Sequence, residues 1–358
     1  MFYSMNKQMQ VKTLKYLTIF LSKGGLGEAI LQTPFYRALK TDAPNSEIIA
    51  LIHKNNFKIL ESNLFIDKVI VYSNFSDLIK KMILLHTIKF STCFIFDKSW
   101  KSNYLARLFI NATKYYGFNR RFWESIPLNF KIPYDASKHE SAYYIDLLQC
   151  THNHPLTPEV FPKESDFECV KKLFPETRAN YIALLAGGAN NPGVGDESFR
   201  RWPVEKYCEL AKDFVKMKYK ILLVGGASDI ELNTFIEATC AGECINLTGR
   251  ISLLQSGIAL SYASLIITND SGLMHLTACF NQNILCLLST SSPVSILLKV
   301  RNAHFIWVDK DLYNSNARVF GTFTIPDDKK QLFLKRLTTK MVYNKAIEIL
   351  SELNIQNR

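Results

Sequence analysis

The sequence predicts an α/β protein built from two doubly wound domains that face a central cleft. Three observations support this prediction. The chain has 358 residues, more than one hydrophobic core usually organises. Short apolar runs alternate with amphipathic helical patterns along the whole chain, as in βαβ units around a parallel sheet. The alternation lapses once, near the middle, in a stretch rich in proline.

The first half of the chain contains five candidate strands separated by helical patterns. We expect these strands at 16–22, 47–53, 68–72, 92–97 and 114–118. A helix is predicted over 29–40, where apolar residues recur on one helical face. Because strands alternate with helices, this half predicts a parallel sheet covered on both faces.

The second half repeats the pattern after a predicted linker over 151–176, which contains four prolines. Strands are expected at 181–186, 220–225, 265–268 and 283–288, and helices at 204–216, 229–240, 252–262 and 271–280. A last helix is expected at 328–353. We therefore predict a first domain over 1–165, a second domain over 166–326 and a C-terminal helical segment over 327–358.

Net charge and cysteine usage restrict the possible partners and compartments. The charge of +11 favours phosphate-rich partners, but no zinc-finger or RNA-recognition pattern accompanies it, so we expect no nucleic-acid partner. The eight cysteines are scattered, several within apolar runs, as is typical of reduced thiols in a cytosolic protein. Cys240 and Cys244 lack a second ligand pair at a suitable spacing, so no metal site is predicted.

Segments that target or span a membrane are not evident in the sequence. The apolar run over 16–21 is too short for a signal peptide, and no run reaches 18 apolar residues. We expect a soluble or peripheral protein on the cytoplasmic side.

A glycine-rich turn follows the first predicted strand and leads directly into a helix. It contains Lys23, Gly24, Gly25 and Gly27, followed by Glu28. Glycines permit a tight turn and close approach of a ligand, and a helix N-terminus attracts anions. Glu28 is a candidate proton acceptor at the rim of the cleft. The alternatives are a plain βα turn and a carboxylate that only complements the helix dipole.

A second glycine turn, containing Gly187, follows the first strand of the second half. Beyond a loop, Arg200 and Arg201 precede Trp202 and a proline at a predicted helix start. Two guanidinium groups beside the cleft would stabilise a diphosphate leaving group as negative charge grows on it. A solvated or salt-bridged pair is the alternative.

The motif most informative about function lies where the predicted strand 265–268 gives way to a helix. Asp270 is expected to cap that helix, with Ser271 and Gly272 supplying amides for a diphosphate. His275 lies one turn further in, where either a donor contact or simple helix packing is expected. Asp229, after the strand 220–225, is a candidate contact of the donor or only a helix cap.

These segments, in this order, resemble glycosyltransferase family 9, the ADP-heptose:lipopolysaccharide heptosyltransferases. The similar blocks are GGLGEAILQTPFYRALK, FRRWPVEKYCELA, ILLVGGASD, NLTGRISLLQSGIALSYASLIITNDSGLMHLTACF and the TSSP at 290–293. The block NDSGLMH is the most specific of them. Two positions depart from the family pattern, because the family commonly has Asp where this chain has Glu28 and often has Lys where it has Arg200.

The resemblance implies a GT-B fold, in which two Rossmann-like domains face each other, and an inverting transferase that needs no metal or other cofactor. It implies that the first domain meets a lipid A–Kdo core acceptor through the loop at 23–27, at the cytoplasmic face of the inner membrane. Glu28 would be the general base, and Arg200 would assist the diphosphate. The donor, ADP-heptose or a similar nucleotide sugar, would meet the second domain, and the last helix would pack back towards the first domain.

The predicted donor contacts are Gly187 and Arg201, from the glycine turn and the arginine pair, and Asp229, Asp270, Ser271, Gly272 and His275, which the resemblance implies. Other functions remain open from the residues alone. They are a GT-B transferase for another nucleotide sugar, a nucleotide-sugar epimerase and a non-catalytic glycolipid-binding protein. A dinucleotide-dependent oxidoreductase is disfavoured, because GGLGEA lacks the GxGxxG spacing.

Overall fold

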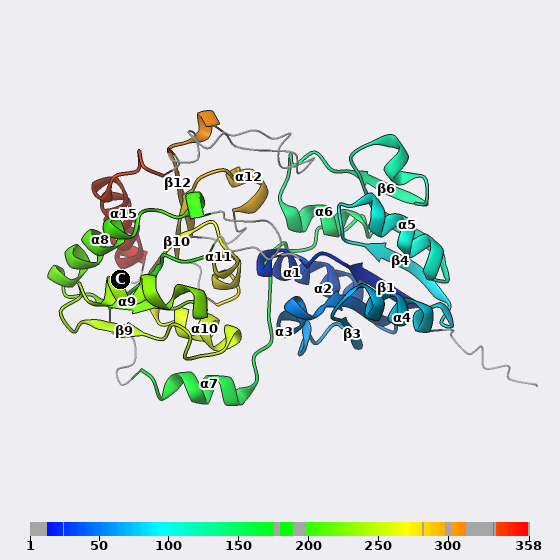
Figure 1. The fold of residues 1–358 in the computed structure, drawn as a ribbon, viewed down its shortest axis with the longest axis horizontal. Coiled ribbons are helices and arrows are strands. Elements are labelled where there is room, and N and C mark those ends of the chain that lie inside the picture. Colours follow the sequence, from blue (N-terminus) through cyan, green and yellow to red (C-terminus); the bar gives the residue numbers. More distant parts are fainter. Residues whose placement is uncertain are drawn as a thin grey trace, which may run out of the picture.

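The chain folds into two halves that lie side by side, each built around one parallel sheet (Figure 1). The computed structural model describes residues 13–23, 25–174, 180–188, 198–280, 283–297, 302–312, 332 and 334–356. The last strand of the first sheet ends at Pro133, and the first strand of the second sheet begins at Tyr181. The two predicted sheets are therefore present.

The first sheet has six strands among the described residues, in the order β3-β2-β1-β4-β5-β6. They are β1 (Lys15–Phe20), β2 (Glu47–His53), β3 (Lys68–Tyr72), β4 (Phe90–Ile95), β5 (Ala112–Asn119) and β6 (Phe130–Pro133). The order reverses between β1 and β4, which pair in parallel. In doubly wound sheets, ligands bind outside the carboxyl ends of the strands at this reversal.

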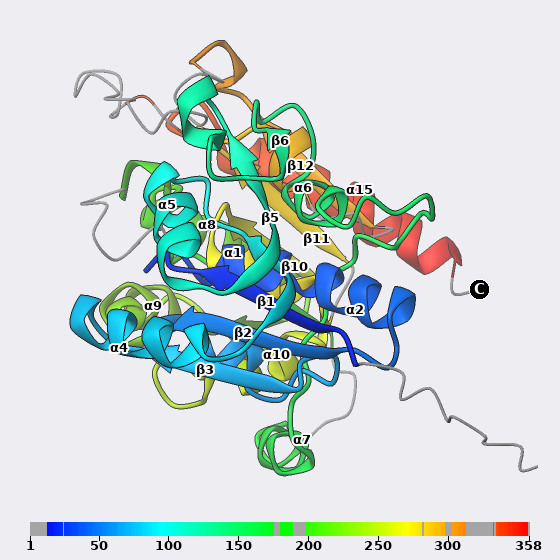
Figure 2. The ribbon, with the colours of Figure 1, turned by 90° about the vertical axis from the view of Figure 1, so that its right-hand side faces the viewer.

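Helices cover both faces of the first sheet, since its strands are apolar on both sides. Figure 2 shows α4 (Phe75–His86) and α5 (Trp100–Phe109) on one face, and α2 (Thr33–Asp42) and α6 (Glu140–Asp146) on the other. Leu17 and Ile19 of β1 are buried in the cluster beneath α4 and α5, whereas Phe20 is buried on the opposite face. This period of two is what a strand between two helical layers requires.

The second sheet repeats this topology, with the order β12-β11-β10-β7-β8-β9 among the described residues. Its strands are β7 (Tyr181–Leu185), β8 (Lys220–Leu223), β9 (Cys244–Asn246), β10 (Ala263–Asn269), β11 (Ile284–Leu288) and β12 (Ala303–Trp307). Its helices include α8 (Val204–Lys216), α9 (Ile230–Glu237), α10 (Leu253–Leu260), α11 (Gly272–Thr277) and α12 (Pro293–Ile296). Here the strand order reverses between β7 and β10.

Several predicted elements differ from the structure. The expected helix over 29–40 is two helices, α1 (Leu26–Leu31) and α2, which are separated at Gln32 just before Pro34 in the first turn of α2. The predicted linker contains a helix, α7 (Glu164–Lys171), which packs against α10. The strands β6, β9 and β12 were not predicted.

The C-terminal helix also differs from the prediction. It is described as α15 (Thr339–Gln356), and residues 327–331 lie outside the described residues. Val342, Ala346 and Ile349 are buried in the same core as α8 and the second sheet. Burial of this apolar face therefore holds α15 on the second domain (Figure 1). The prediction that the last helix packs back towards the first domain was wrong.

The connection between the halves is fixed to the first domain over part of its length. The Arg37 guanidinium of α2 donates to the Glu159 carboxylate at 2.5 Å and to the carbonyls of Pro155 and Thr157. The Glu159 amide in turn donates to the Thr33 hydroxyl at 2.9 Å. The segment up to residue 159 thus belongs structurally to the first half.

Candidate active site

The two halves meet where helix α1 of the first domain contacts helix α11 of the second (Figure 1). Two glycines permit this contact. A Cβ on Gly27 would lie 2.4 Å from the His275 ring, and a Cβ on Gly272 would lie 2.8 Å from the Leu26 side chain. The N-terminal turns of both helices, each following the central strand of its sheet, are therefore brought to one junction.

Ser271, rather than Asp270, is the N-cap of α11. Its hydroxyl accepts a hydrogen bond from the Met274 amide at 3.4 Å. The prediction that Asp270 caps this helix was wrong, because the Asp270 carboxylate is bound to Arg200 at 2.7 Å and accepts from the Ser291 hydroxyl. His275 is buried at the junction with α1.

The two arginines are both held by groups of the site. Arg200 binds the carboxylate and the carbonyl of Asp270, while the Arg201 side chain donates to the Gly188 carbonyl at 2.7 Å. Trp202 next to them is buried, and its ring nitrogen donates to the Leu337 carbonyl. Of the alternatives that the sequence left open, the structure thus contains the salt-bridged form of Arg200.

The glycine turn after β7 is closely packed on two polar side chains. A Cβ on Gly187 would lie 2.3 Å from the Asp229 carboxylate, and one on Gly188 would lie 2.5 Å from Ser271 Cβ. Asp229 is buried, and its carboxylate accepts from the Gly226 amide at 2.9 Å. Gly188 has φ +94°, a conformation that favours glycine. Asp229 and Ser271 are therefore brought together through this turn.

Glu28 lies in the first turn of α1, next to Gly27, and its side chain is 41% exposed. It faces a cavity of about 650 Å³ at the carboxyl ends of β1 and β4. Polar residues that line this cavity include Ser22, Lys23, Asn74, Asp97, Lys98 and Arg120. Of the predicted loop, Gly25 is the N-cap of α1 and its carbonyl accepts from the Glu28 amide, while Gly24 lies outside the described residues.

Asp97, which the sequence reasoning missed, fixes the loop between β1 and α1. Its two carboxylate oxygens accept from the amides of Leu21 and Ser22, at 2.6 and 2.7 Å. Burial raises the pKa of the Asp97 carboxyl to about 7, against the opposing effect of these amides, and the nearby Glu28 raises it further. Asp97 thus positions the start of the loop that carries Lys23.

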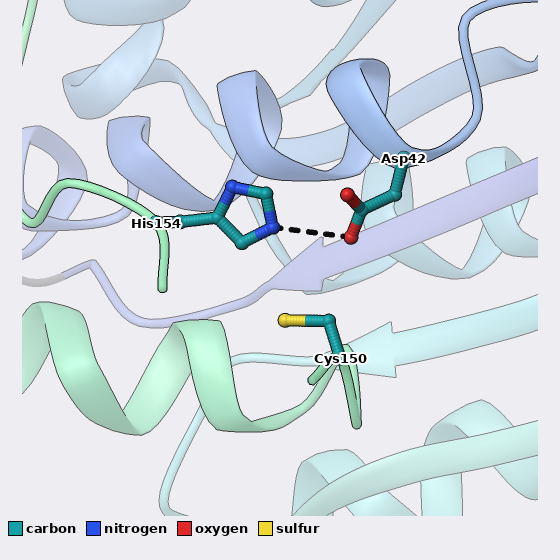
Figure 3. Close-up of side chains that lie close together, drawn as sticks. All are labelled: Asp42, Cys150 and His154. Atoms are coloured by element: carbon teal, nitrogen blue, oxygen red, sulfur yellow. Dashed lines mark hydrogen bonds and ion pairs between the residues drawn. The ribbon is translucent and has the colours of Figure 1, made fainter. Parts of the chain in front are cut away.

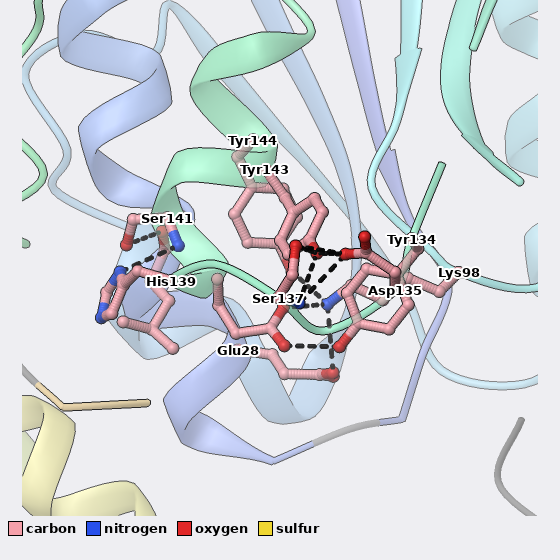
Figure 4. Close-up of polar contacts among 11 residues, drawn as sticks. Glu28, Lys98, Tyr134, Asp135, Ser137, His139, Ser141, Tyr143 and Tyr144 are labelled. Atoms are coloured by element: carbon pink, nitrogen blue, oxygen red, sulfur yellow. Dashed lines mark hydrogen bonds and ion pairs between the residues drawn. The ribbon is translucent and has the colours of Figure 1, made fainter. Parts of the chain in front are cut away.

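Lys98, also missed, lies at the centre of a buried polar network beside Glu28 (Figure 4). Its ammonium is 2.5 Å from the Glu140 carboxylate, 3.3 Å from the Tyr144 hydroxyl and 4.0 Å from Glu28. It also lies 4.9 Å from the ring centre of Tyr134. Burial alone would lower the pKa of Lys98, but Glu140 and the other neighbours hold that pKa well above its usual value, so Lys98 stays charged.

The described residues also place three possible metal ligands together, away from the junction of the halves. They are Asp42 at the end of α2, Cys150 and His154, whose donor atoms lie within 4.8 Å of one another (Figure 3). The His154 ring is 3.2 Å from the Asp42 carboxylate, and the Cys150 thiol donates to the His152 carbonyl. Each of the three side chains thus has a hydrogen-bond partner within the protein, and the expectation of no metal stays a prediction.

Two doubly wound domains that meet at the loops after their central strands define the GT-B class of fold. The solved structures support this class. A glycosyl transferase family 9 protein from Veillonella parvula superposes with a TM-score of 0.76 at 22% identity, covering 95% of this chain and 98% of that one. The ADP-heptose lps heptosyltransferase II of E. coli has a TM-score of 0.74 at 22% identity and covers 95% and 100%.

The family follows from the sequence comparisons. The family model described as glycosyltransferase family 9 (heptosyltransferase) matches residues 85–319. Lipopolysaccharide heptosyltransferase 2 of Escherichia coli K12 is 39% identical over 106 residues, which are 28% of this chain and 30% of that relative. The alignments to the first curated relatives thus span about a third of their length. This chain belongs to glycosyltransferase family 9.

No helix among the described residues has both the length and the hydrophobicity that crossing a bilayer requires.

Proposed function

We propose that this chain is an inverting, metal-independent glycosyltransferase that moves a heptose from ADP-heptose to the inner core of lipopolysaccharide or lipooligosaccharide. Membership of the family and the named activity of its relatives support this proposal. The observation that carries it is the contact of α1 with α11. This contact packs the first turn of α1, which carries Glu28, against α11 of the other domain, and it supports a reaction in which acceptor and donor groups meet at the junction.

In the proposed reaction, Glu28 removes the proton from an acceptor hydroxyl. The oxygen attacks the anomeric carbon of the heptose as the bond from that carbon to the ADP oxygen breaks, and ADP leaves with the electron pair. Ser271 and Gly272 supply amides at the start of α11, and Arg200 supplies positive charge near the departing diphosphate. Asp229 and His275 line the donor side. Positioning and electrostatic stabilisation are the main sources of rate acceleration.

The acceptor is proposed to be a lipid A–Kdo core glycolipid, held in the polar cavity that Glu28 faces. Lys23, Lys98, Lys101 and Arg120 line this cavity, and their charges suit a phosphorylated or carboxylated glycan. Such an acceptor is anchored in a bilayer, so we place the working enzyme at the cytoplasmic face of the inner membrane as a peripheral protein.

The test is Glu28→Gln. The variant keeps the shape of the side chain but has no basic carboxylate, so we expect at least about a 100-fold loss of turnover. Binding of ADP-heptose, measured as the rise in melting temperature that it causes, should be retained. Glu61→Gln, which removes an exposed carboxylate of the same domain, is the matched control and should keep normal turnover. Near-normal turnover of Glu28→Gln would remove Glu28 from this role.

The identity of the donor is tested with a panel of nucleotide sugars. ADP-heptose should raise the melting temperature most, and wild-type protein should release ADP from it only when acceptor is present. A larger shift with another nucleotide sugar would contradict the proposed donor.

A further inference from the structure

An apolar groove of about 740 Å³ lies on the first domain, beside the polar cavity. It is formed by helix α5, the start of α4 and the segment after β5. Its lining includes Phe75, Trp100, Tyr104, Leu108, Ile126 and Pro127. Helix α5 lies on the face of the sheet opposite α2 and α6 (Figure 2), so these side chains are not covered by the helices of that face.

The side chains around this groove are unusually exposed for their type. Leu108, Phe122 and Ile126 are 71%, 81% and 66% exposed. The ring centres of Trp100 and Trp123 lie 5.5 Å apart, and both side chains are partly exposed. Trp100, Tyr104, Leu108 and Ile126 line the groove, the Tyr104 hydroxyl donates to the Trp123 carbonyl, and Phe122 is next to Trp123 in the chain. These six residues are here called the α5 surface. Contiguous exposed apolar patches of this kind mark interaction sites.

Positive charge is concentrated in the same part of the chain. Residues 73–132 contain ten Lys or Arg and three Asp or Glu, so they carry most of the net charge of +11. Two of the three acidic residues, Asp97 and Glu124, are buried. Lys101 and Arg107 line the groove, and the Lys101 ammonium lies 5.9 Å from the centre of the Trp100 ring. The Lys131 ammonium lies 5.7 Å from the centre of the Phe122 ring. The apolar surface is therefore bordered by cations.

We propose that the α5 surface docks on an anionic lipid bilayer. Aromatic side chains prefer the level of the lipid headgroups. Lys and Arg side chains beside them can bind anionic headgroups while their aliphatic carbons stay in contact with apolar surface. Charge complementarity thus favours a bilayer over an uncharged partner.

The position of the α5 surface relative to the cavity supports this choice. Phe75, Lys101 and Leu105 line both the apolar groove and the polar cavity that Glu28 faces. A bilayer seated on the α5 surface therefore lies next to the mouth of the cavity. The inference rests on the proposed function in this respect, because a sugar that is anchored in the bilayer would reach Glu28 without leaving the membrane.

The experiment measures sedimentation of the full chain with vesicles of phosphatidylcholine, with and without phosphatidylglycerol. Wild-type protein should bind the anionic vesicles more tightly, and added salt should weaken this binding. The triple variant Leu108→Ser, Phe122→Ser, Ile126→Ser should bind them at least about 10-fold more weakly, since three apolar side chains no longer enter the interface. Arg107→Glu, which reverses a charge that lines the groove, together with Lys131→Glu beside Phe122, should remove the preference for anionic vesicles.

The matched control removes three exposed apolar side chains of the second domain. It is Phe167→Ser, Phe235→Ser, Met341→Ser, and it should bind vesicles as wild type does. Equal loss in both triple variants, or none in the first, would overturn the proposal. So would a wild-type dimer in analytical ultracentrifugation that the first triple variant abolishes, because the α5 surface would then be an interface between two copies.

Turnover separates this inference from the proposed function. With a water-soluble acceptor whose acyl chains have been removed, the turnover of the first triple variant should match that of wild type. With acceptor embedded in vesicles, its turnover should fall by the same factor as its affinity for the vesicles. Vesicle binding without any transfer from ADP-heptose would refute the proposed function but would not contradict the proposed docking surface. Transfer without vesicle binding would refute the docking surface alone.

Discussion

Asp97 has a carboxyl group whose pKa, about 7, should make the stability of the protein depend on pH. Between its ordinary pKa of 3.8 and about 7, the folded chain keeps a proton that the unfolded chain releases. The free energy of unfolding should therefore decrease, by a few kcal/mol at most, as the pH rises from about 4 to about 7.

Urea unfolding at pH 5 and pH 8 tests this expectation. Asp97→Asn cannot titrate, so the difference between the two pH values should be smaller in this variant than in wild type. Identical differences in both proteins would show that Asp97 titrates normally.

Lys98 and Glu140 form an ion pair whose members depend on each other. Glu140 is 5% exposed, so Lys98→Met would leave a buried carboxylate without its cation and should lower the free energy of unfolding by about 3–5 kcal/mol. Adding Glu140→Gln should restore part of this loss. A double-mutant cycle in urea measures the coupling, and additive effects of the two substitutions would contradict the pairing.

How much of the site could be predicted depends on how local each contact is. Glu28, Ser271 and Gly272 lie within short motifs next to glycines, and the structure brings them to one junction. Asp97 could not be predicted, because its proximity to Leu21 arises only when β4 pairs with β1 across 76 residues of sequence. Asp270 was wrongly predicted to cap α11, because the choice between two adjacent capping residues is decided by the distant Arg200.

Among the secondary elements, the strands that escaped prediction are all at the edges of their sheets. β6, β9 and β12 each end one of the two strand orders. The segment Phe130–Pro133 is half exposed and Cys244–Asn246 has three residues, so neither forms the buried apolar run that identifies a central strand. The central strands are buried on both faces and were predicted to within a few residues.

The contact between α1 and α11 should be sensitive to one methyl group. Gly27→Ala places a Cβ 2.4 Å from the His275 ring, so the two helices must separate. We expect a larger radius of gyration by small-angle X-ray scattering and at least about a 10-fold loss of turnover, because the reacting groups move apart.

Gly257→Ala is the matched control for this substitution. Its Cβ would lie 2.3 Å from the Phe280 ring, a clash within the second domain. It should lower the melting temperature without increasing the radius of gyration. An unchanged radius for Gly27→Ala would contradict the role of this contact in holding the halves together.

For the whole molecule, transfer is expected to survive removal of metal ions. The proposed reaction stabilises the diphosphate with Arg200 and helix amides, so turnover in EDTA should equal turnover without it. Loss of activity that Mg²⁺ or Zn²⁺ restores would contradict metal independence. Cys150→Ser then shows where such a metal binds. If the metal binds at the Asp42, Cys150 and His154 cluster, added metal should no longer restore the activity of this variant, whereas a metal that arrives with the substrate should still restore it.

The bonds that tie the connection to α2 determine how the two halves can move. The chain is held by Arg37 up to Glu159, and from Glu164 it is already part of α7, which packs on the second domain. Between these points Phe161 still packs on Phe65 of the first domain, with ring centres 5.8 Å apart, and Lys163 lies 3.9 Å from the Glu61 carboxylate, so rotation between the domains must be absorbed close to the start of α7. A pivot this short favours swinging over sliding, so in the proposed reaction the donor should enter and ADP should leave through an angular opening at the side away from the pivot.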